Sequence, residues 1–158
     1  MIDASYPLSP MQQGMLFHSL VAQELGVYVQ QHLSTLHEAL NVDAFVCAWE
    51  RVVARHGILR TAFRWEGLNE PLQYVYHHVP LPLQVFDWRG VSAEQQHAKV
   101  EAYLQEDRRR GFTLTEAPLM RLTLIRLAAS EYLCLWTYHH SLLDGRSRVV
   151  VLQELFAV

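Results

Sequence analysis

The sequence predicts an α/β domain of two layers, in which helices cover a sheet. Apolar residues recur at helical spacing between Val42 and Val53, where they form one face of a helix. By contrast, residues 120–127 and 132–138 form apolar runs of strand length, which are typical of buried strands. Because segments of both kinds alternate along a chain of only 158 residues, we expect them to share one core.

The first helix is expected over residues 10–22. Ser9 is a suitable N-cap, and Pro10 fits the first turn because its missing N–H would have no partner there anyway. Met11 and Met15 recur at helical spacing. We interpret this methionine-rich face as core packing rather than as a ligand site.

The second helix is expected to begin after the N-cap Asn41 and to end near Gly57, a plausible left-handed C-cap. Cys47 falls in this helix, and Cys134 falls in an apolar strand. A free cysteine in such a pattern usually behaves as a small hydrophobic residue. Both are therefore expected to be reduced and buried, in a cytoplasmic protein.

A third helix is expected from Ser92 to about Arg110, closed by Gly111. Its charged end, residues 106–110, is interpreted as a solvated helix end whose cations suit the helix dipole, rather than as a docking site for an acidic carrier protein. A last helix is expected from Arg146 to Val158.

Strands are expected where β-branched and aromatic residues gather between turn signals. These segments are residues 27–37, 61–65, 72–77, 120–127 and 132–138, with at most a short edge strand at 85–86 after Pro80 and Pro82.

Composition excludes several classes of function. The net charge of −3 and the pI near 6.3 disfavour a nucleic-acid partner. No apolar run approaches the roughly 20 residues that cross a bilayer, and the N-terminus lacks a secretion signal, so no membrane role is expected. Residues 149–158 are apolar and end without a cap, which predicts a surface that awaits a partner.

Chemically capable residues gather at 138–147, directly after the apolar run that ends at Tyr138. Neighbouring residues of a strand point to opposite faces, so His139 and His140 cannot share one task. Asp144 follows four residues after His140, and Gly145 permits a sharp turn.

The segment at 139–145 matches every fixed position of the His-His-x-x-x-Asp-Gly signature, and it resembles the condensation domains of nonribosomal peptide synthetases and their relatives, the chloramphenicol acetyltransferases. Residues 8–18 resemble the opening motif of condensation domains. Residues 55–63 resemble their Arg-His-Glu-x-Leu-Arg-Thr-x-Phe motif, with Gly57 in place of the Glu. Three motifs in the family's order span nearly the whole chain.

The resemblance implies a chloramphenicol acetyltransferase-like lobe, a two-layer α/β sandwich with a mixed sheet covered by helices. It implies that residues 1–158 are the N-terminal lobe of a condensation domain, without the C-terminal lobe. The family joins an acyl or peptidyl thioester on one carrier protein to the amine of an aminoacyl thioester on the next. No cofactor is bound directly, because the phosphopantetheine arms belong to the carriers. The opening motif looks more like that of domains taking a D-configured donor.

The resemblance also implies the partners: donor and acceptor carrier proteins, the missing C-terminal lobe and the neighbouring synthetase domains. Because the family's tunnel runs between two lobes, the isolated chain is expected to be inactive. Its unpartnered apolar surface is expected to make it self-associate.

Among the site residues, His140 is the expected catalytic residue, because a neutral imidazole can accept and return a proton near neutral pH. His139 is expected to be structural. Asp144 could orient the imidazole as part of a catalytic dyad, or it could be a buried carboxylate held by an arginine. The resemblance favours the second role, with Arg60 as the partner, and it favours Gly145 as the turn that leaves room for a substrate arm. Ser147 is assigned no covalent role.

Two other kinds of site fit the sequence poorly, whereas relatives of the condensation domains stay open as alternatives. A metal site is disfavoured because the adjacent pairs His77-His78 and His139-His140 lack metal-ligand spacing. A serine hydrolase is disfavoured because no Gly-x-Ser-x-Gly occurs. An epimerisation domain or acyltransferase of the same superfamily, or a carrier-binding fragment without catalytic activity, would show the same motifs.

Overall fold

The computed structural model describes residues 1–22, 27–142 and 145–156. In chain order its elements are β1 (Ile2–Pro7), α1 (Pro10–Ala22), β2 (Val29–Leu36), α2 (Val42–Arg55), the 3₁₀ turn η1 (Gly57–Arg60), β3 (Thr61–Arg64), β4 (Leu72–Tyr76), β5 (Leu83–Asp87), α3 (Ala93–Arg110), β6 (Met120–Ala128), β7 (Glu131–His139) and α4 (Gly145–Phe156).

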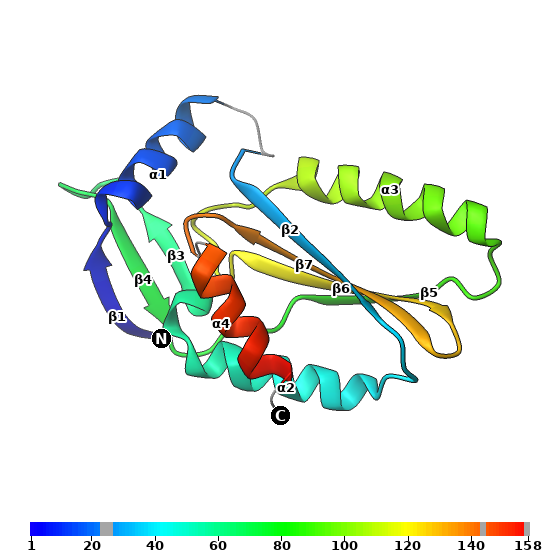
Figure 1. Cartoon of the computed structure of the whole chain (residues 1–158). Coiled ribbons are helices and arrows are strands. Elements are labelled where there is room, and N and C mark those ends of the chain that lie inside the picture. Colours follow the sequence, from blue (N-terminus) through cyan, green and yellow to red (C-terminus); the bar gives the residue numbers. More distant parts are fainter. Residues whose placement is uncertain (23–26, 143–144, 157–158) are drawn as a thin grey trace.

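The strands form two sheets (Figure 1). The larger sheet has the order β2-β7-β6-β5, with β5 parallel to β6 and the other pairs antiparallel. The smaller sheet, β1-β4-β3, is antiparallel throughout. The predicted α/β class with a mixed sheet is therefore confirmed. The edge strand expected at 85–86 is confirmed as β5, although it is longer than expected.

Helices cover both faces of the larger sheet, with α3 on one face and α2 and α4 on the other (Figure 1). The sheet is therefore a middle layer between helices, rather than one of only two layers as the sequence predicts. Val100 of α3 packs with Ile125 and Leu133. On the opposite face, the indole rings of Trp49 from α2 and Trp136 from β7 meet edge to face, with centroids 5.1 Å apart. Because β7 is buried on both faces, it reads as a continuous apolar run in the sequence rather than as an alternating one.

The three predicted N-caps and one of the two predicted glycine C-caps are confirmed. The side-chain oxygens of Ser9, Asn41 and Ser92 each accept a hydrogen bond from the backbone N–H three residues later, at 3.2, 3.1 and 3.3 Å. Gly111 closes α3 with a φ of 59°, in the left-handed region that favours glycine.

Gly57 is not a left-handed C-cap, so that prediction is wrong. Helix α2 ends at Arg55, and its C-cap is His56 in an extended conformation, with φ at −107°. Gly57 instead begins η1. A Cβ atom at this position would lie 3.1 Å from Cγ1 of Val75, so the glycine is explained by close approach to β4.

Two burial predictions are also wrong. Met11 is 68% exposed and Met15 is half-buried, because α1 buries Leu16 instead. Cys47 is exposed, because the buried face of α2 is formed by Phe45, Trp49, Val52 and Val53, and position 47 lies away from it. Cys134 is buried as predicted, and its burial raises the pKa of the thiol to about 12, which keeps it unreactive.

The charged end of α3 is not uniformly solvated, which corrects a further prediction. Asp107 is only 3% exposed, and its carboxylate pairs with Arg121 of β6, Nε to Oδ1, at 2.6 Å. Glu106 and Arg109 stay on the surface, where they pair with each other.

Candidate active site

The two histidines lie at the end of β7 in different surroundings. His139 is the last strand residue and is 3% exposed, whereas His140 is partly exposed. The backbone N–H of His140 donates to the carbonyl of Tyr28, at 2.7 Å. Its ring Nδ1 is buried and has no hydrogen-bond partner among the residues that the structure describes. The position next to the strand end is thus fixed through the backbone, and within the described residues no hydrogen bond engages Nδ1 of its ring.

His139 is held by its own turn. Its Nδ1 accepts the backbone N–H of Ser141 at 3.2 Å and lies 2.6 Å from the Ser141 hydroxyl. Because a backbone N–H can only donate, Nδ1 carries no proton, and the ring hydrogen is on Nε2. Burial, and secondarily the neighbouring His140, lowers the pKa of His139 to about 4, so the ring is neutral at cellular pH.

Tyr28 connects the opening motif to the histidine pair. Its hydroxyl lies 2.7 Å from Nδ1 of His18, and its ring centroid lies 6.1 Å from that of His139. Its φ is 63°, a conformation that a residue with a bulky side chain rarely adopts. Sequence reasoning misses this residue, because no composition signal marks a positive φ at a tyrosine.

A second contact joins the same two motifs. Gln12 of α1 donates from Nε2 to the carbonyl of Ser141 at 3.3 Å. Residues 8–18 and 138–142, which lie more than a hundred positions apart in the sequence, therefore meet at the strand end.

A cavity of about 190 Å³ opens beside His139. Its lining is mainly apolar and aromatic, and the hydroxyl of Ser19 is buried in it without a partner in the described part of the chain. The lining residues are Ser19, Leu20, Val27, Trp65, Phe112, Leu114 and His139.

Arg60 is largely buried and is bound on several sides. Its Nε donates to the carbonyl of Val53 at 3.1 Å, and one terminal nitrogen lies 3.2 Å from Oδ2 of Asp3 on β1. The same nitrogen donates to the carbonyl of Tyr76. Asp144, the expected partner, lies outside the described residues, so the Arg60–Asp144 pair stays a prediction. Gly145 is the first residue of α4.

Within residues 1–22, 27–142 and 145–156, no group of three or more His, Cys, Asp or Glu side chains could hold a metal ion. In the same part of the chain, no helix is long and apolar enough to cross a membrane.

A family model described as the condensation domain matches residues 2–158. The chain belongs to the condensation domain family. A linear gramicidin synthase protein of Brevibacillus parabrevis is 49% identical over 156 residues, which are 99% of this chain and 2% of that protein. Bacitracin synthase 1 of Bacillus licheniformis is 38% identical over 157 residues, 99% of this chain and 3% of that protein. The chain thus spans a very small part of the length of these relatives.

Solved condensation domains share the fold. The starter condensation domain of the rhizomide synthetase RzmA superposes with a TM-score of 0.85 at 22% identity, covering 97% of this chain and 38% of that one. The four-domain nonribosomal peptide synthetase AB3403 superposes with a TM-score of 0.86 at 18% identity, covering 99% of this chain and 12% of that one. The chloramphenicol acetyltransferase-like fold expected of this condensation domain sequence is therefore confirmed.

Proposed function

We propose that this chain is the histidine-bearing N-terminal lobe of a condensation domain that forms peptide bonds between two carrier-bound thioesters. The donor is an acyl or peptidyl thioester, and the acceptor is an aminoacyl thioester. The observation that carries the proposal is the position of His140: directly after the buried strand β7, fixed through its backbone to Tyr28, with the residue as a whole partly exposed.

The chemistry asks little of the protein beyond positioning and proton handling, because a thioester is already activated. The acceptor amine attacks the carbonyl carbon, a C–N bond forms, and the C–S bond to the donor arm breaks. The proton that the amine loses ends on the departing thiol. His140 would take this proton or hold the amine in line for attack.

His139 is suited to a supporting role and unsuited to proton transfer. It is buried, its Nδ1 is occupied by Ser141, and its low pKa keeps it from acting as an acid near neutral pH. This division of tasks agrees with the opposite faces that neighbouring strand residues present.

The partners in this proposal are the donor and acceptor carrier proteins, which bring the phosphopantetheine arms, and a second lobe that completes the channel. The chain covers 38% of the solved starter condensation domain, which supports the need for further residues. The 158-residue chain alone is therefore expected to make no peptide bond.

The test is a condensation assay with the intact synthetase that carries this chain, its carriers loaded with a donor of either D or L configuration and with an acceptor. His140→Ala should lower the rate by ~100-fold to ~10,000-fold, which is the usual contribution of a general acid–base group. The control is His97→Ala, because His97 lies on the surface of α3, where its side chain is 78% exposed.

Three results would count against the proposal. If the unmodified protein formed no amide from either donor, the function would be wrong. If His140→Ala condensed at the wild-type rate, the role of His140 would be wrong. If only the L-configured donor reacted, the D-donor preference implied by the opening motif would be wrong.

A further inference from the structure

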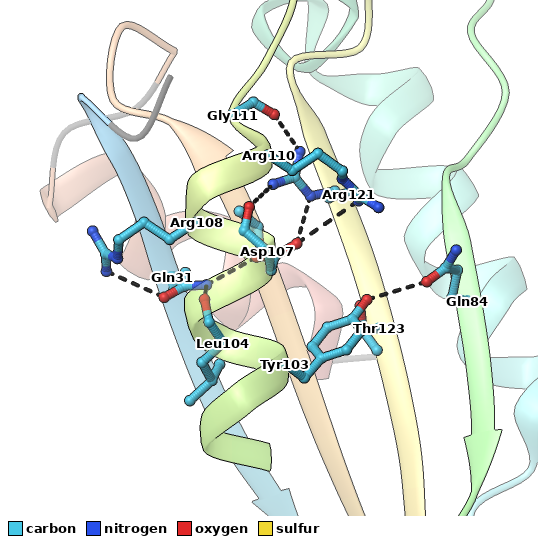
Figure 2. A network of polar contacts seen from close by, with 11 residues as sticks. Gln31, Gln84, Tyr103, Leu104, Asp107, Arg108, Arg110, Gly111, Arg121 and Thr123 are labelled. Carbon is cyan, nitrogen blue, oxygen red and sulfur yellow. Dashed lines mark hydrogen bonds and ion pairs between the residues drawn. The ribbon is translucent and has the colours of Figure 1, made fainter. Parts of the chain in front are cut away.

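The carboxylate of Asp107 forms the centre of a buried polar network between α3 and the larger sheet (Figure 2). Its side chain is 1% exposed. Oδ1 accepts Nε of Arg121 at 2.6 Å, and the Arg121 guanidinium also donates to the carbonyls of Gly111, at 2.6 Å, and of Asp107 itself. Oδ2 accepts the hydroxyl of Thr137 at 2.6 Å and Nε2 of Gln31 at 2.9 Å.

The network holds an ionised carboxylate. Burial alone would raise the pKa of Asp107, but the hydrogen bonds from Thr137, Gln31 and Arg121 outweigh it and hold that pKa below its usual value. A buried ion pair is often no more stabilising than apolar packing of the same volume. What such a network adds is a fixed geometry, because each bond has a preferred length and direction.

Two strands are tied to α3 close to the histidines. Thr137 lies on β7 two residues before His139, and Gln31 is its register partner on β2. Arg108, next to Asp107, donates to the carbonyl of Val29 at 3.0 Å, and Val29 is the register partner of His139. The residue before Val29 is Tyr28, whose carbonyl accepts the backbone N–H of His140.

We propose that Asp107 is a positioning residue for His140, acting through Thr137 and Gln31 on the ends of β7 and β2. This inference rests on the proposed function. Strand ends are the parts of a sheet most prone to fraying, and His140 lies one residue beyond such an end. A displacement of about 1 Å at a catalytic group can cost as much as ~100-fold in rate, so a network that fixes this end bears directly on catalysis.

The sharpest variant is Thr137→Val, which keeps the shape of the side chain and removes the hydroxyl donor. Asp107 retains Arg121 and Gln31 in this variant. We expect kcat for condensation to fall by about 10-fold with KM for the loaded carriers unchanged, because Thr137 is 1% exposed and its substitution leaves the protein surface as it is. Thr137→Ser keeps the hydroxyl and should restore most of the rate.

Val100→Ala provides the matched control. Val100 fastens the same helix to the same sheet through apolar contacts with Ile125 and Leu133 and takes no part in the network. It should lower the unfolding temperature and leave kcat unchanged at temperatures where the protein is folded.

A second readout separates this inference from the proposed function. In histidine-labelled intact protein, the ring resonances of His140 should shift in Thr137→Val and keep their wild-type positions in Val100→Ala. Unshifted resonances, or a kcat equal to wild type in Thr137→Val, would overturn the positioning role. An equal loss of kcat in Val100→Ala would reduce the network to general support of the fold. If the unmodified protein formed no amide, the proposed function would fail, and the resonances would still decide the inference.

Discussion

The Nδ1 atom of His139 accepts the backbone N–H of Ser141, two residues further along the chain, so the ring is fixed in its neutral form. Because of this hydrogen bond, the folded protein should become less stable when the pH is lowered. Protonation of His139 would place a charge in a buried site and would leave the Ser141 N–H facing a donor instead of an acceptor.

Stability should therefore fall as the pH drops from about 6.5 toward 4. The unfolded chain takes up a proton on His139 near its ordinary pKa of 6.5, whereas the folded protein does so only near 4. Between pH 7 and pH 5 this one group should lower the free energy of unfolding by about 2 kcal/mol. His139→Gln should have a lower stability at pH 7 and a shallower loss between pH 7 and 5.

Urea unfolding of both proteins at several pH values measures these slopes. His32, whose pKa burial also lowers, remains in both proteins, so its contribution to the slope cancels in the comparison. Equal slopes in the two proteins would show that His139 is not held neutral.

Features with a local cause could be predicted from the sequence. Ser9, Asn41 and Ser92 cap their helices because a short polar side chain reaches the N–H three residues on, which requires nothing beyond the neighbouring sequence. The continuous apolar run of β7 likewise reports burial on both faces.

Features that depend on distant partners could not be predicted in this way. Asp107 is buried because Arg121, Thr137 and Gln31 meet it from three strands, and a run of charges in the sequence gives no sign of that. The sequence does not predict strand β1, because this strand lies at a sheet edge with almost every residue exposed and shows no apolar alternation.

The residues of the candidate site also fall into those that the sequence predicts and those that only the fold reveals. The histidine pair and its neighbours stand together in the sequence, so their motif could be recognised. Tyr28, which joins that motif to His18, carries no signal before the fold brings the two ends together.

The paired indoles of Trp49 and Trp136 offer a test of the core. Both side chains are at most 1% exposed, and neither indole N–H has an acceptor in the described part of the chain. Trp49→Ala should therefore cost ~3–5 kcal/mol, as other large truncations in cores do. Trp49→Phe should cost clearly less, because it keeps an aromatic contact and removes a buried donor that has no partner.

Chemical unfolding followed by circular dichroism checks this order, since it does not depend on tryptophan fluorescence. If Trp49→Phe lowered the free energy of unfolding as much as Trp49→Ala does, the indole N–H would have a hydrogen-bond acceptor that contributes to stability.

Two glycines should respond to alanine in opposite directions. Gly14 lies inside α1, and beyond its chain neighbours and the backbone of its own helix no atom lies within 4 Å of the place that a Cβ atom would take there, so Gly14→Ala should stabilise the protein by roughly 0.5–1 kcal/mol. Gly57→Ala should destabilise it, because the new methyl group would meet Cγ1 of Val75 at 3.1 Å.

Val75→Ala removes that obstacle and supplies the control. The double variant Gly57→Ala/Val75→Ala should be more stable than the sum of the two single changes predicts, as measured by a double-mutant cycle in thermal unfolding. Strict additivity would show that Val75 is not what excludes a side chain at position 57.

The last prediction concerns the apolar residues that the chain leaves on its surface. Helix α4 exposes Val149, Val150 and Phe156, at 46%, 44% and 59%, and α1 exposes Phe17 at 71%. Apolar surface gathered on one element usually marks a contact, so the 158-residue chain, expressed alone, should self-associate as its concentration rises. The sequence predicts the contact at the terminal helix and the histidine-bearing edge, and the exposure of α1 adds a further candidate. Light scattering over a range of concentrations separates them: Phe156→Lys should reduce association if α4 mediates it, and Phe17→Lys if α1 does. Val85→Lys, at an exposed position on β5, is the control for added charge. A chain that stayed monomeric at high concentration would show that neither helix forms such a contact.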